Sequence, residues 1–215
     1  MERLVGQVLF VVGREGGSPR TLRDLVEAAL EGGVGGVELR EKELPLSELL
    51  SEAEMTAGLV HAAGALLLIN DRVDVALAVG ADGVHLGLED FPISWARRAL
   101  GQEAIIGGTC RTARQAEQAA AAGASYVSAG PVFGSPTKPQ LRPRGLRVVR
   151  EIAGAVEIPV CAIGGITAQR VESVMTAGAA LVAVSSAISR AEDVEQAARG
   201  LVGEVARCYS ERRSR

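Results

Sequence analysis

A glycine that follows an alanine-rich run and precedes a short apolar segment recurs four times along the chain. The matches are EGGVGGVELR, AVGADGVHLG, AAGASYVSAG and TAGAALVAVS, and their valines are Val37, Val84, Val127 and Val182. Glycine is the usual residue just past the end of a helix, where the backbone turns left-handed. Each match therefore predicts a helix, a stop and a short buried strand, in that order.

Further strands and helices lie between these matches. The other strand candidates are QVLFVVG at 7–13, ALLLIN at 65–70, AIIGGT at 104–109 and PVCAIGG at 159–165. Composition predicts helices in TLRDLVEAAL, LSELLSEAEMTAGLVHAAG, RVDVALAVG, SWARRAL, ARQAEQAAAAG, LRVVREIAG, AQRVESVMTAG and VEQAARGLVGEVARCYS. Eight strands, each followed by a helix, predict a single α/β domain over residues 1–215, a (β/α)8 TIM barrel. A doubly wound open sheet is the alternative, but the regular recurrence favours a sheet that closes on itself.

Composition and charge exclude several classes of function. Hydrophobic residues make up 47% of the chain, which supports a sizeable core and excludes a disordered chain. The net charge of −3 and the aromatic content of 3% lack the basic surface and stacking platforms of nucleic-acid binding. No apolar run approaches the roughly 18 to 20 residues of a membrane span, and no N-terminal stretch resembles a signal peptide. We expect a cytoplasmic protein without nucleic-acid or membrane partners.

The three cysteines point to the same compartment. Cys110, Cys161 and Cys208 lie far apart without CxxC spacing. An odd, scattered set suits reduced thiols better than a disulfide framework. We expect each to be a small buried apolar residue.

The stretch VELREK at 37–42 carries the first functional signal. Glu38, Arg40 and Lys42 alternate along a predicted strand and therefore share one face. Burying a column of unpaired charge costs several kcal/mol per group, so these charges are expected to meet a ligand. In a (β/α)8 barrel, catalytic groups gather at the C-terminal ends of the strands. The charges are therefore predicted to point into the mouth of the barrel.

Other predicted strands also end in polar residues. The remaining ends carry Asn70, Asp71, Asp90, Thr109 and Arg111, and the later strands open into the loops GPVFGSPTK, IGGI and VSSA. Arg40, Lys42 and Lys138 supply cationic donors for phosphoryl oxygens. Asp71 and Asp90 supply the hard carboxylates that magnesium prefers. We expect a Mg2+-bound diphosphate here; the alternative is that these groups only neutralise one another as ion pairs.

A second anion site is predicted at IGGI (163–166) and VSSA (184–187). Their small residues leave backbone N–H groups open at the starts of the following helices, where such barrels commonly bind phosphate. Tight packing of Gly164 and Gly165 is the alternative. Ser135, Thr137 and Lys138 could serve either anion. Two phosphate sites and a metal predict that two phosphorylated small molecules are joined with release of diphosphate. His85 lies within a predicted strand, and a hydrogen-bonded structural role is favoured for it.

The chain resembles the thiamine-phosphate synthases from about the first strand to the last helix. VELREK is similar to their VQLREK, and INDRVDVALAVGADGVHLGLEDFP to their INDRVDLALAVGADGVHLGQEDMP; GPVFGSPTK and AIGGI match further signatures. The resemblance implies a (β/α)8 transferase of thiamine biosynthesis. Such an enzyme uses Mg2+ to join 4-amino-5-hydroxymethyl-2-methylpyrimidine diphosphate to a thiazole phosphate, giving thiamine phosphate and diphosphate.

The resemblance also implies roles for individual residues. Asp71 and Asp90 would bind Mg2+, and Glu38 would face the pyrimidine. The diphosphate would be surrounded by Arg40, Lys42, Asn70, Thr109 and Lys138, and the thiazole phosphate by Ser135, Thr137, Gly165, Ser185 and Ser186. The family's dissociative chemistry would make Arg40, Lys42, Thr109 and Lys138 catalytic through charge stabilisation of the leaving group.

Several positions depart from the family's pattern. Glu38 and Leu88 each replace a glutamine, Thr109 a serine, Arg111 a histidine, and GS at 134–135 replaces PT. The sister family of thiazole tautomerases is one alternative, but its catalytic histidine aligns with Arg111 and it lacks the paired acidic ligands. A non-catalytic thiazole-phosphate binder is another, and retention of Asp71 and Asp90 speaks against it. The sequence is compatible with a homo-oligomer.

Overall fold

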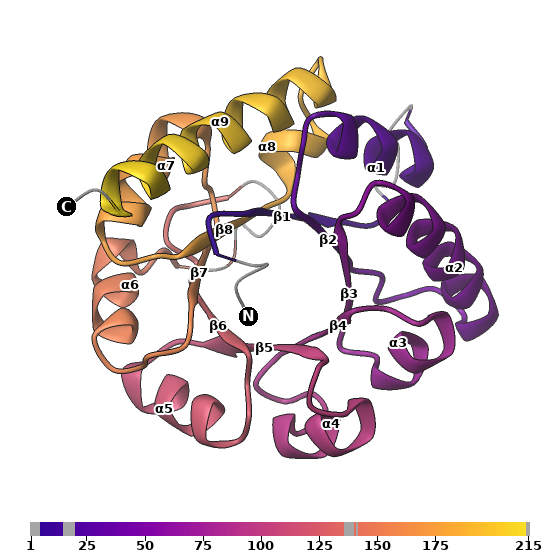
Figure 1. Cartoon of the computed structure of the whole chain (residues 1–215), viewed down its shortest axis with the longest axis horizontal. Helices are drawn as coiled ribbons and strands as arrows, with labels where there is room; N and C mark the ends of the chain where they lie inside the picture. Colours follow the sequence, from indigo (N-terminus) through magenta and orange to yellow (C-terminus); the bar gives the residue numbers. More distant parts are fainter. Residues whose placement is uncertain (1–4, 15–19, 136–139, 141, 214–215) are drawn as a thin grey trace.

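Eight parallel strands close into a barrel in the computed structural model, which describes residues 5–14, 20–135, 140 and 142–213 (Figure 1). The strands are β1 (Val8–Val12), β2 (Gly36–Leu39), β3 (Leu66–Asn70), β4 (Gly83–Leu86), β5 (Ile105–Cys110), β6 (Tyr126–Ala129), β7 (Val160–Ile163) and β8 (Leu181–Val184). Their order is the chain order, and β1 pairs with both β2 and β8. The closed sheet confirms the predicted (β/α)8 barrel and excludes the doubly wound alternative, which would leave open edges.

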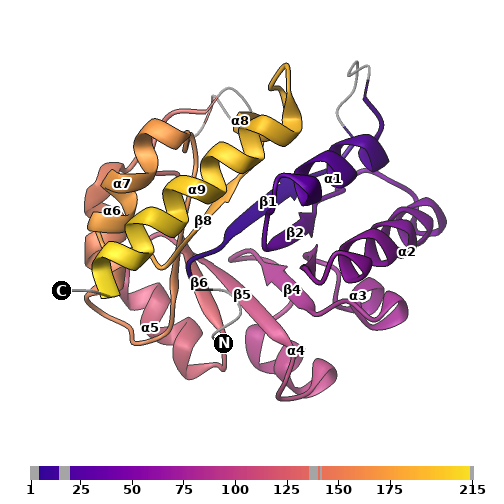
Figure 2. The same cartoon turned by 45° about the horizontal axis from the view of Figure 1, so that its top comes forward.

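Helices surround the strands on the outside (Figures 1 and 2). They are α1 (Leu22–Glu31), α2 (Leu46–Ala62), α3 (Val73–Val79), α4 (Ile93–Leu100), α5 (Ala113–Ala121), α6 (Gly145–Ala153), α7 (Ala168–Thr176), α8 (Ser186–Ser189) and α9 (Val194–Arg213). Each predicted helix is present. The short α8 was not predicted, because a segment of its length cannot display a helical hydrophobic period.

The recurring glycines end helices as the sequence predicts. Gly33, Gly80, Gly123 and Gly178 have φ values of 88°, 64°, 95° and 112°. A residue with a Cβ is strained in this left-handed region. At the end of α3, the Gly80 N–H bonds to the carbonyls of the last helical turn. The repeat in the sequence is therefore a repeated backbone requirement of the helix-to-strand turn.

Strand residues alternate between two apolar layers. One set packs against the helices, and the other fills the inside of the barrel with Leu9, Val11, Leu66, Leu68, Ile105, Tyr126, Cys161, Leu181 and Ala183. Towards the C-terminal ends of the strands the inner layer becomes polar, with Glu38, Asn70, His85 and Ser128 all buried. Buried polar groups are expensive unless they are partnered, so this end of the barrel is where a ligand would be recognised.

The structure confirms the prediction that the three cysteines are buried. Cys110, Cys161 and Cys208 are free and buried. Burial raises the pKa of the Cys110 thiol to about 11, so this side chain is protonated at neutral pH. Within the described part of the chain, every helix is too short or too polar to cross a membrane.

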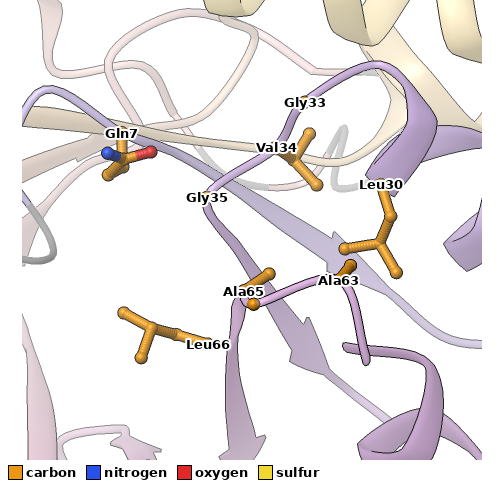
Figure 3. A pocket seen from close by; sticks show the side chains of 9 residues that line it. Gln7, Leu30, Gly33, Val34, Gly35, Ala63, Ala65 and Leu66 are labelled. Carbon is orange, nitrogen blue, oxygen red and sulfur yellow. The ribbon is translucent and has the colours of Figure 1, made fainter. Parts of the chain in front are cut away.

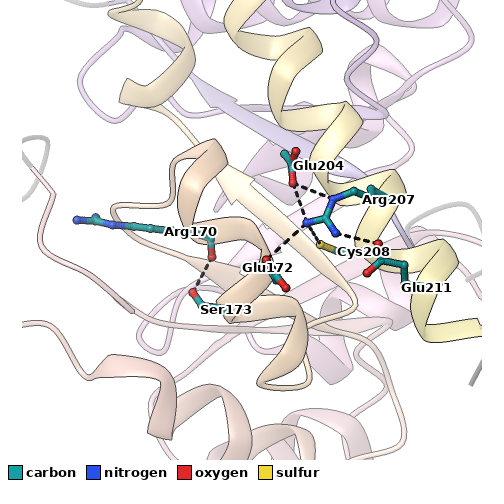
Figure 4. Close-up of polar contacts among 7 residues, drawn as sticks. All are labelled: Arg170, Glu172, Ser173, Glu204, Arg207, Cys208 and Glu211. Carbon is teal, nitrogen blue, oxygen red and sulfur yellow. Dashed lines mark hydrogen bonds and ion pairs between the residues drawn. The ribbon is translucent and has the colours of Figure 1, made fainter.

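The last helix completes the outer ring by packing against α7 and α1. Arg207 on α9 lies 3.0 Å from Glu204 Oε2 and 2.9 Å from Glu211 Oε1 on the same helix, and 3.6 Å from Glu172 Oε2 on α7 (Figure 4). These side chains are exposed, so the ion pairs add little stability. The buried face of α9, made by Val194, Ala198, Leu201 and Val205, holds the helix in place.

Candidate active site

A cavity of about 250 Å³ lies at the C-terminal ends of the strands. Most of the predicted site residues line it: Glu38, Arg40, Asn70, Thr109, Ser135, Gly165, Ser185 and Ser186. These residues lie in or directly after β2, in β3 and β5, in the loops after β6, β7 and β8, and at the start of α8. These segments are far apart in the sequence. The barrel therefore brings these predicted polar groups together in one cavity.

The deep part of the cavity is walled by buried polar side chains. Glu38 is 4% exposed, Asn70 is 7% exposed and His85 is 8% exposed. Among the described residues, the Asn70 side-chain nitrogen Nδ2 is the one buried side-chain polar atom without a hydrogen-bond partner. Leaving such a donor unpaired costs about 1–3 kcal/mol. A bound group that accepts from Asn70 would recover this energy.

His85 holds a hydrogen-bonded place in the cavity wall. Its Nδ1 lies 2.8 Å from the Tyr126 hydroxyl, and its Nε2 lies 3.0 Å from Thr109 Oγ1. The His85 carbonyl accepts from the Asp71 N–H at 2.8 Å. The structural role favoured from the sequence is therefore present, and it links three residues of the site region.

Two carboxylates and a lysine meet at the rim, beside the residues that line the cavity. Lys42 Nζ lies 2.8 Å from Asp71 Oδ2, and the Gly87 N–H donates to Asp90 Oδ2 at 2.7 Å. Asp71 has a φ of 64°, the one positive value at a non-glycine residue in the described ranges. Such a backbone costs energy and is kept where the surrounding structure requires it. Here it fixes the Asp71 carboxylate at the mouth of the barrel.

Each of the two carboxylates shifts the pKa of the other. Burial alone would raise the pKa of Asp71, but its hydrogen bonds with Asp90 and Lys42 outweigh burial and lower that pKa below its usual value. The hydrogen bond with Asp71, together with partial burial, raises the pKa of Asp90. Two adjacent carboxylates repel one another when both are ionised, so a cation at this point is favourable.

The donor set at the rim fits Mg2+. Asp71 and Asp90 offer hard carboxylate oxygens, and Mg2+ in phosphoryl sites is commonly held by one or two carboxylates plus substrate phosphates. No group of three or more His, Cys, Asp or Glu side chains able to hold a metal occurs in the part of the chain that the structure describes. The remaining ligands would then come from water or from a bound phosphate.

The ion-pair alternative holds for one cation of the predicted set. Lys42 is paired with Asp71. Arg40, by contrast, lines the cavity and has no ion pair within the described ranges. A guanidinium facing a cavity is suited to bind an anionic group in a bidentate manner.

The glycines after β7 serve packing and the cavity together. A Cβ on Gly164 would lie 2.7 Å from Pro131 Cα, and one on Gly165 would lie 2.3 Å from the Gly134 carbonyl oxygen. Both also have positive φ, at 103° and 62°. The packing alternative is therefore correct, and it does not compete with ligand binding, because both glycines also line the cavity.

The sequence analysis did not identify several residues that lie near the site. Tyr126 and Ser128 in β6 contact His85, and Arg170 on α7 donates to the Gly165 carbonyl at 2.6 Å while lying 4.6 Å above the Phe133 ring. The alternation of β6 was the available signal for the first two. The predicted residues Thr137 and Lys138 lie outside the described residues.

A larger cavity, of about 350 Å³, lies at the opposite end of β1, β2 and β3 (Figure 3). It is lined by Gln7, Leu30, Gly33, Val34, Gly35, Ala63, Gly64, Ala65 and Leu66. None of these carries a charge, so this cavity offers no acid, base or anion-binding side chain. Chemistry rather than volume identifies the cavity at the C-terminal ends as the candidate site.

Known proteins resemble this chain over most of its length. A family model described as thiamine monophosphate synthase matches residues 8–188. A thiamine-phosphate synthase of Roseiflexus castenholzii is 47% identical over 197 residues, which cover 91% of this chain and 86% of that protein. The bifunctional thiamine biosynthesis protein ThiM/ThiE of Symbiobacterium thermophilum is 49% identical over 195 residues, covering 90% of this chain but 41% of that protein. The solved thiamine phosphate pyrophosphorylase of Pyrococcus furiosus superposes with a TM-score of 0.86 at 36% identity, covering 97% of this chain and 99% of that one.

Proposed function

The chain belongs to the thiamine monophosphate synthase family, and from that premise we propose how its cavity performs the reaction. The activity is that of a thiamine-phosphate synthase, a transferase of thiamine biosynthesis that acts on phosphorylated small molecules. The proposed substrates are 4-amino-5-hydroxymethyl-2-methylpyrimidine diphosphate and a thiazole phosphate. The observation that carries this proposal is one cavity that has an arginine and the loops after β6, β7 and β8 in its wall, with a carboxylate pair at its rim.

The diphosphate is proposed to lie between Arg40 and the carboxylate pair. Asp71 and Asp90 would hold Mg2+, which when bound neutralises charge on the diphosphate oxygens. Arg40, Lys42 and Lys138 would add cationic donors, and Asn70 and Thr109 would donate neutral hydrogen bonds. The interactions of these groups with the diphosphate strengthen as negative charge builds on the leaving oxygens. An interaction that is stronger in the transition state than in the bound substrate lowers the barrier.

The pyrimidine ring is proposed to contact Glu38. This carboxyl group is buried and lines the cavity beside Asn70 and His85. An ionised glutamate accepts hydrogen bonds only, and the exocyclic amine of the pyrimidine is a matching donor. The negative charge would also favour the cation that develops on the pyrimidine.

The thiazole phosphate is proposed to lie against the loops after β6, β7 and β8. Ser135, Gly165, Ser185 and Ser186 line this side of the cavity, and Thr137 belongs to the same proposal. Small residues at these loops leave backbone N–H groups accessible to an anion. Arg170 steadies the loop by donating to the Gly165 carbonyl.

The proposed reaction is dissociative. The C–O bond between the pyrimidine methylene and the diphosphate breaks, and its electron pair leaves with the diphosphate. The thiazole nitrogen then donates its lone pair to the pyrimidine-stabilised cation and forms the new C–N bond. The protein contributes positioning and charge stabilisation, which requires no nucleophilic side chain.

Two alternatives make different demands on the site. A thiazole tautomerase needs a proton-transfer group where this chain has Arg111, and a guanidinium keeps its proton at neutral pH. A non-catalytic binder has no use for the paired carboxylates at the rim. Both features favour the synthase reaction.

The decisive experiment is an assay of the purified chain with both substrates and Mg2+, following thiamine phosphate and diphosphate. We expect the two products in equal amounts and none when either substrate is omitted. Isomerisation of the thiazole without coupling would instead indicate a tautomerase. Binding of thiazole phosphate without any turnover would indicate a binder.

Lys138 provides a further prediction. Because a cation near the leaving group acts most strongly once the C–O bond is breaking, Lys138→Ala should lower kcat by about tenfold, the scale of one charge-assisted hydrogen bond. The KM for thiazole phosphate should change less. Arg142→Ala, which removes an exposed cation a few residues away, serves as the control. An unchanged kcat with a large rise in that KM would assign Lys138 to the thiazole phosphate.

We further propose that the enzyme works in the cytoplasm. Its cysteines are free and buried, which suits a reducing compartment. Fractionation of the source cells with an antibody against the chain tests this directly.

A further inference from the structure

Two side chains meet across an intervening strand inside the barrel. His85 of β4, Gly107 of β5 and Tyr126 of β6 occupy one register, each paired with the next. A Cβ on Gly107 would lie 2.3 Å from Tyr126 Cζ and 2.5 Å from His85 Nδ1. Glycine at this point is therefore what allows the side chains of β4 and β6 to form a hydrogen bond.

Among the described residues, the Tyr126 hydroxyl has one hydrogen-bond partner to which it can donate its proton. Tyr126 is 0% exposed, and its hydrogen bond among the described residues is the one to His85 Nδ1 at 2.8 Å. A buried hydroxyl without an acceptor is costly, so the phenol donates to Nδ1. Burial raises the pKa of Tyr126 well above its usual value, and the charge of Glu38 adds to this, so the phenol keeps its proton.

This bond determines which nitrogen of His85 carries the proton. Nδ1 can accept only when it is unprotonated, so the neutral ring holds its proton on Nε2. Nε2 lies 3.0 Å from Thr109 Oγ1 and 3.4 Å from Ser128 Oγ. The Nε2–H therefore donates mainly to Thr109 Oγ1. The hydroxyl proton of Thr109 is then free to be donated to another group.

We propose that Tyr126 is a positioning residue that acts on the substrate through His85 and Thr109. By fixing the Nε2–H tautomer, it makes Thr109 an acceptor from His85 and presents the Thr109 hydroxyl proton to an anionic oxygen in the cavity. The inference rests on the proposed contact between Thr109 and the diphosphate. A donor oriented before the substrate arrives needs no rearrangement as charge develops on the leaving group.

The tautomer can be observed without any activity measurement. The chain has two histidines, so 15N-histidine labelling gives NMR signals from only two rings. The other histidine, His61, lies on the exposed side of α2, and its Nε2 is 3.1 Å from Asp82 Oδ2. Its NMR signals serve as an internal reference. We expect the parent protein to show His85 with a protonated Nε2 and an unprotonated Nδ1. A protonated Nδ1 in the parent overturns the proposal, and this arm depends on no variant being folded.

Kinetics of Tyr126→Phe test the consequence for catalysis. Without the Tyr126 hydroxyl, His85 Nδ1 loses its hydrogen-bond donor, so we expect a mixture of the two neutral tautomers of His85. The kcat should fall about fivefold, with little change in the KM for thiazole phosphate. Tyr209→Phe, which removes the hydroxyl of the chain's other tyrosine on α9, is the matched control and should stay within about twofold of the parent in kcat. Tyr126→Phe with parental kcat overturns the proposal.

A double variant separates this inference from the proposed role of Thr109. If Tyr126 acts through Thr109, Tyr126→Phe combined with Thr109→Val should be within about twofold of Thr109→Val alone. A further fivefold loss would show that Tyr126 acts independently and would overturn the inference while leaving Thr109 in its role. Full kcat in Thr109→Val itself would overturn both the inference and the proposed contact of Thr109 with the diphosphate.

Discussion

Asp71→Asn and Asp90→Asn are each expected to raise the activation barrier by at least ~2 kcal/mol, which is about a 30-fold loss in rate. The leaving diphosphate carries several negative charges, and each variant removes one carboxylate that would hold the compensating Mg2+. Asparagine tolerates the left-handed backbone found at Asp71, where φ is 64°, so the loss in that variant reports charge rather than strain. The measurement is kcat against Mg2+ concentration for each variant.

The control for both variants is Asp74→Asn. Asp74 lies on α3, three residues beyond Asp71, and its exposed carboxylate pairs with Arg72. It should keep parental activity. A chelator should abolish the activity of the parent protein, and added Mg2+ should restore it. Full activity of Asp71→Asn and Asp90→Asn in the presence of the chelator would rule out the metal assignment.

Glu38→Ala is expected to weaken binding of the pyrimidine diphosphate by about 1–3 kcal/mol, the scale of leaving a buried partner unpaired. Glu38 is 4% exposed and lines the cavity. Glu38→Gln keeps one acceptor oxygen for the exocyclic amine and adds an NH2 donor, so we expect an active enzyme. Calorimetry measures the affinity of both variants for the pyrimidine diphosphate, and steady-state kinetics measure their kcat.

Glu43→Ala removes an exposed carboxylate five residues along the chain and is the control for the loss of negative charge near the cavity. Its affinity for the pyrimidine diphosphate should equal that of the parent. Parental affinity in Glu38→Ala would instead show that Glu38 only balances the charge of Arg40. Comparison of the two variants thus distinguishes recognition of the ring from a general electrostatic effect.

Much of the site could be read from the sequence, because the relevant information is local. Alternation from β2 into the residue that follows it places Glu38 and Arg40 on one face, and the position of Asn70 at the end of a strand places it at the barrel mouth. Both inferences use residues within a few positions of one another. The structure places these three side chains in the wall of the same cavity.

The sequence by itself determined the barrel, since the helix-ending glycines and the period of the strands are properties of short segments. Only the tertiary structure decided that Lys42 pairs with Asp71, that Tyr126 reaches His85 over Gly107, and that His85 meets Thr109. These contacts depend on the register between neighbouring strands. Register is set by hydrogen bonds and packing between segments separated by many residues, and no pattern within one strand carries that information.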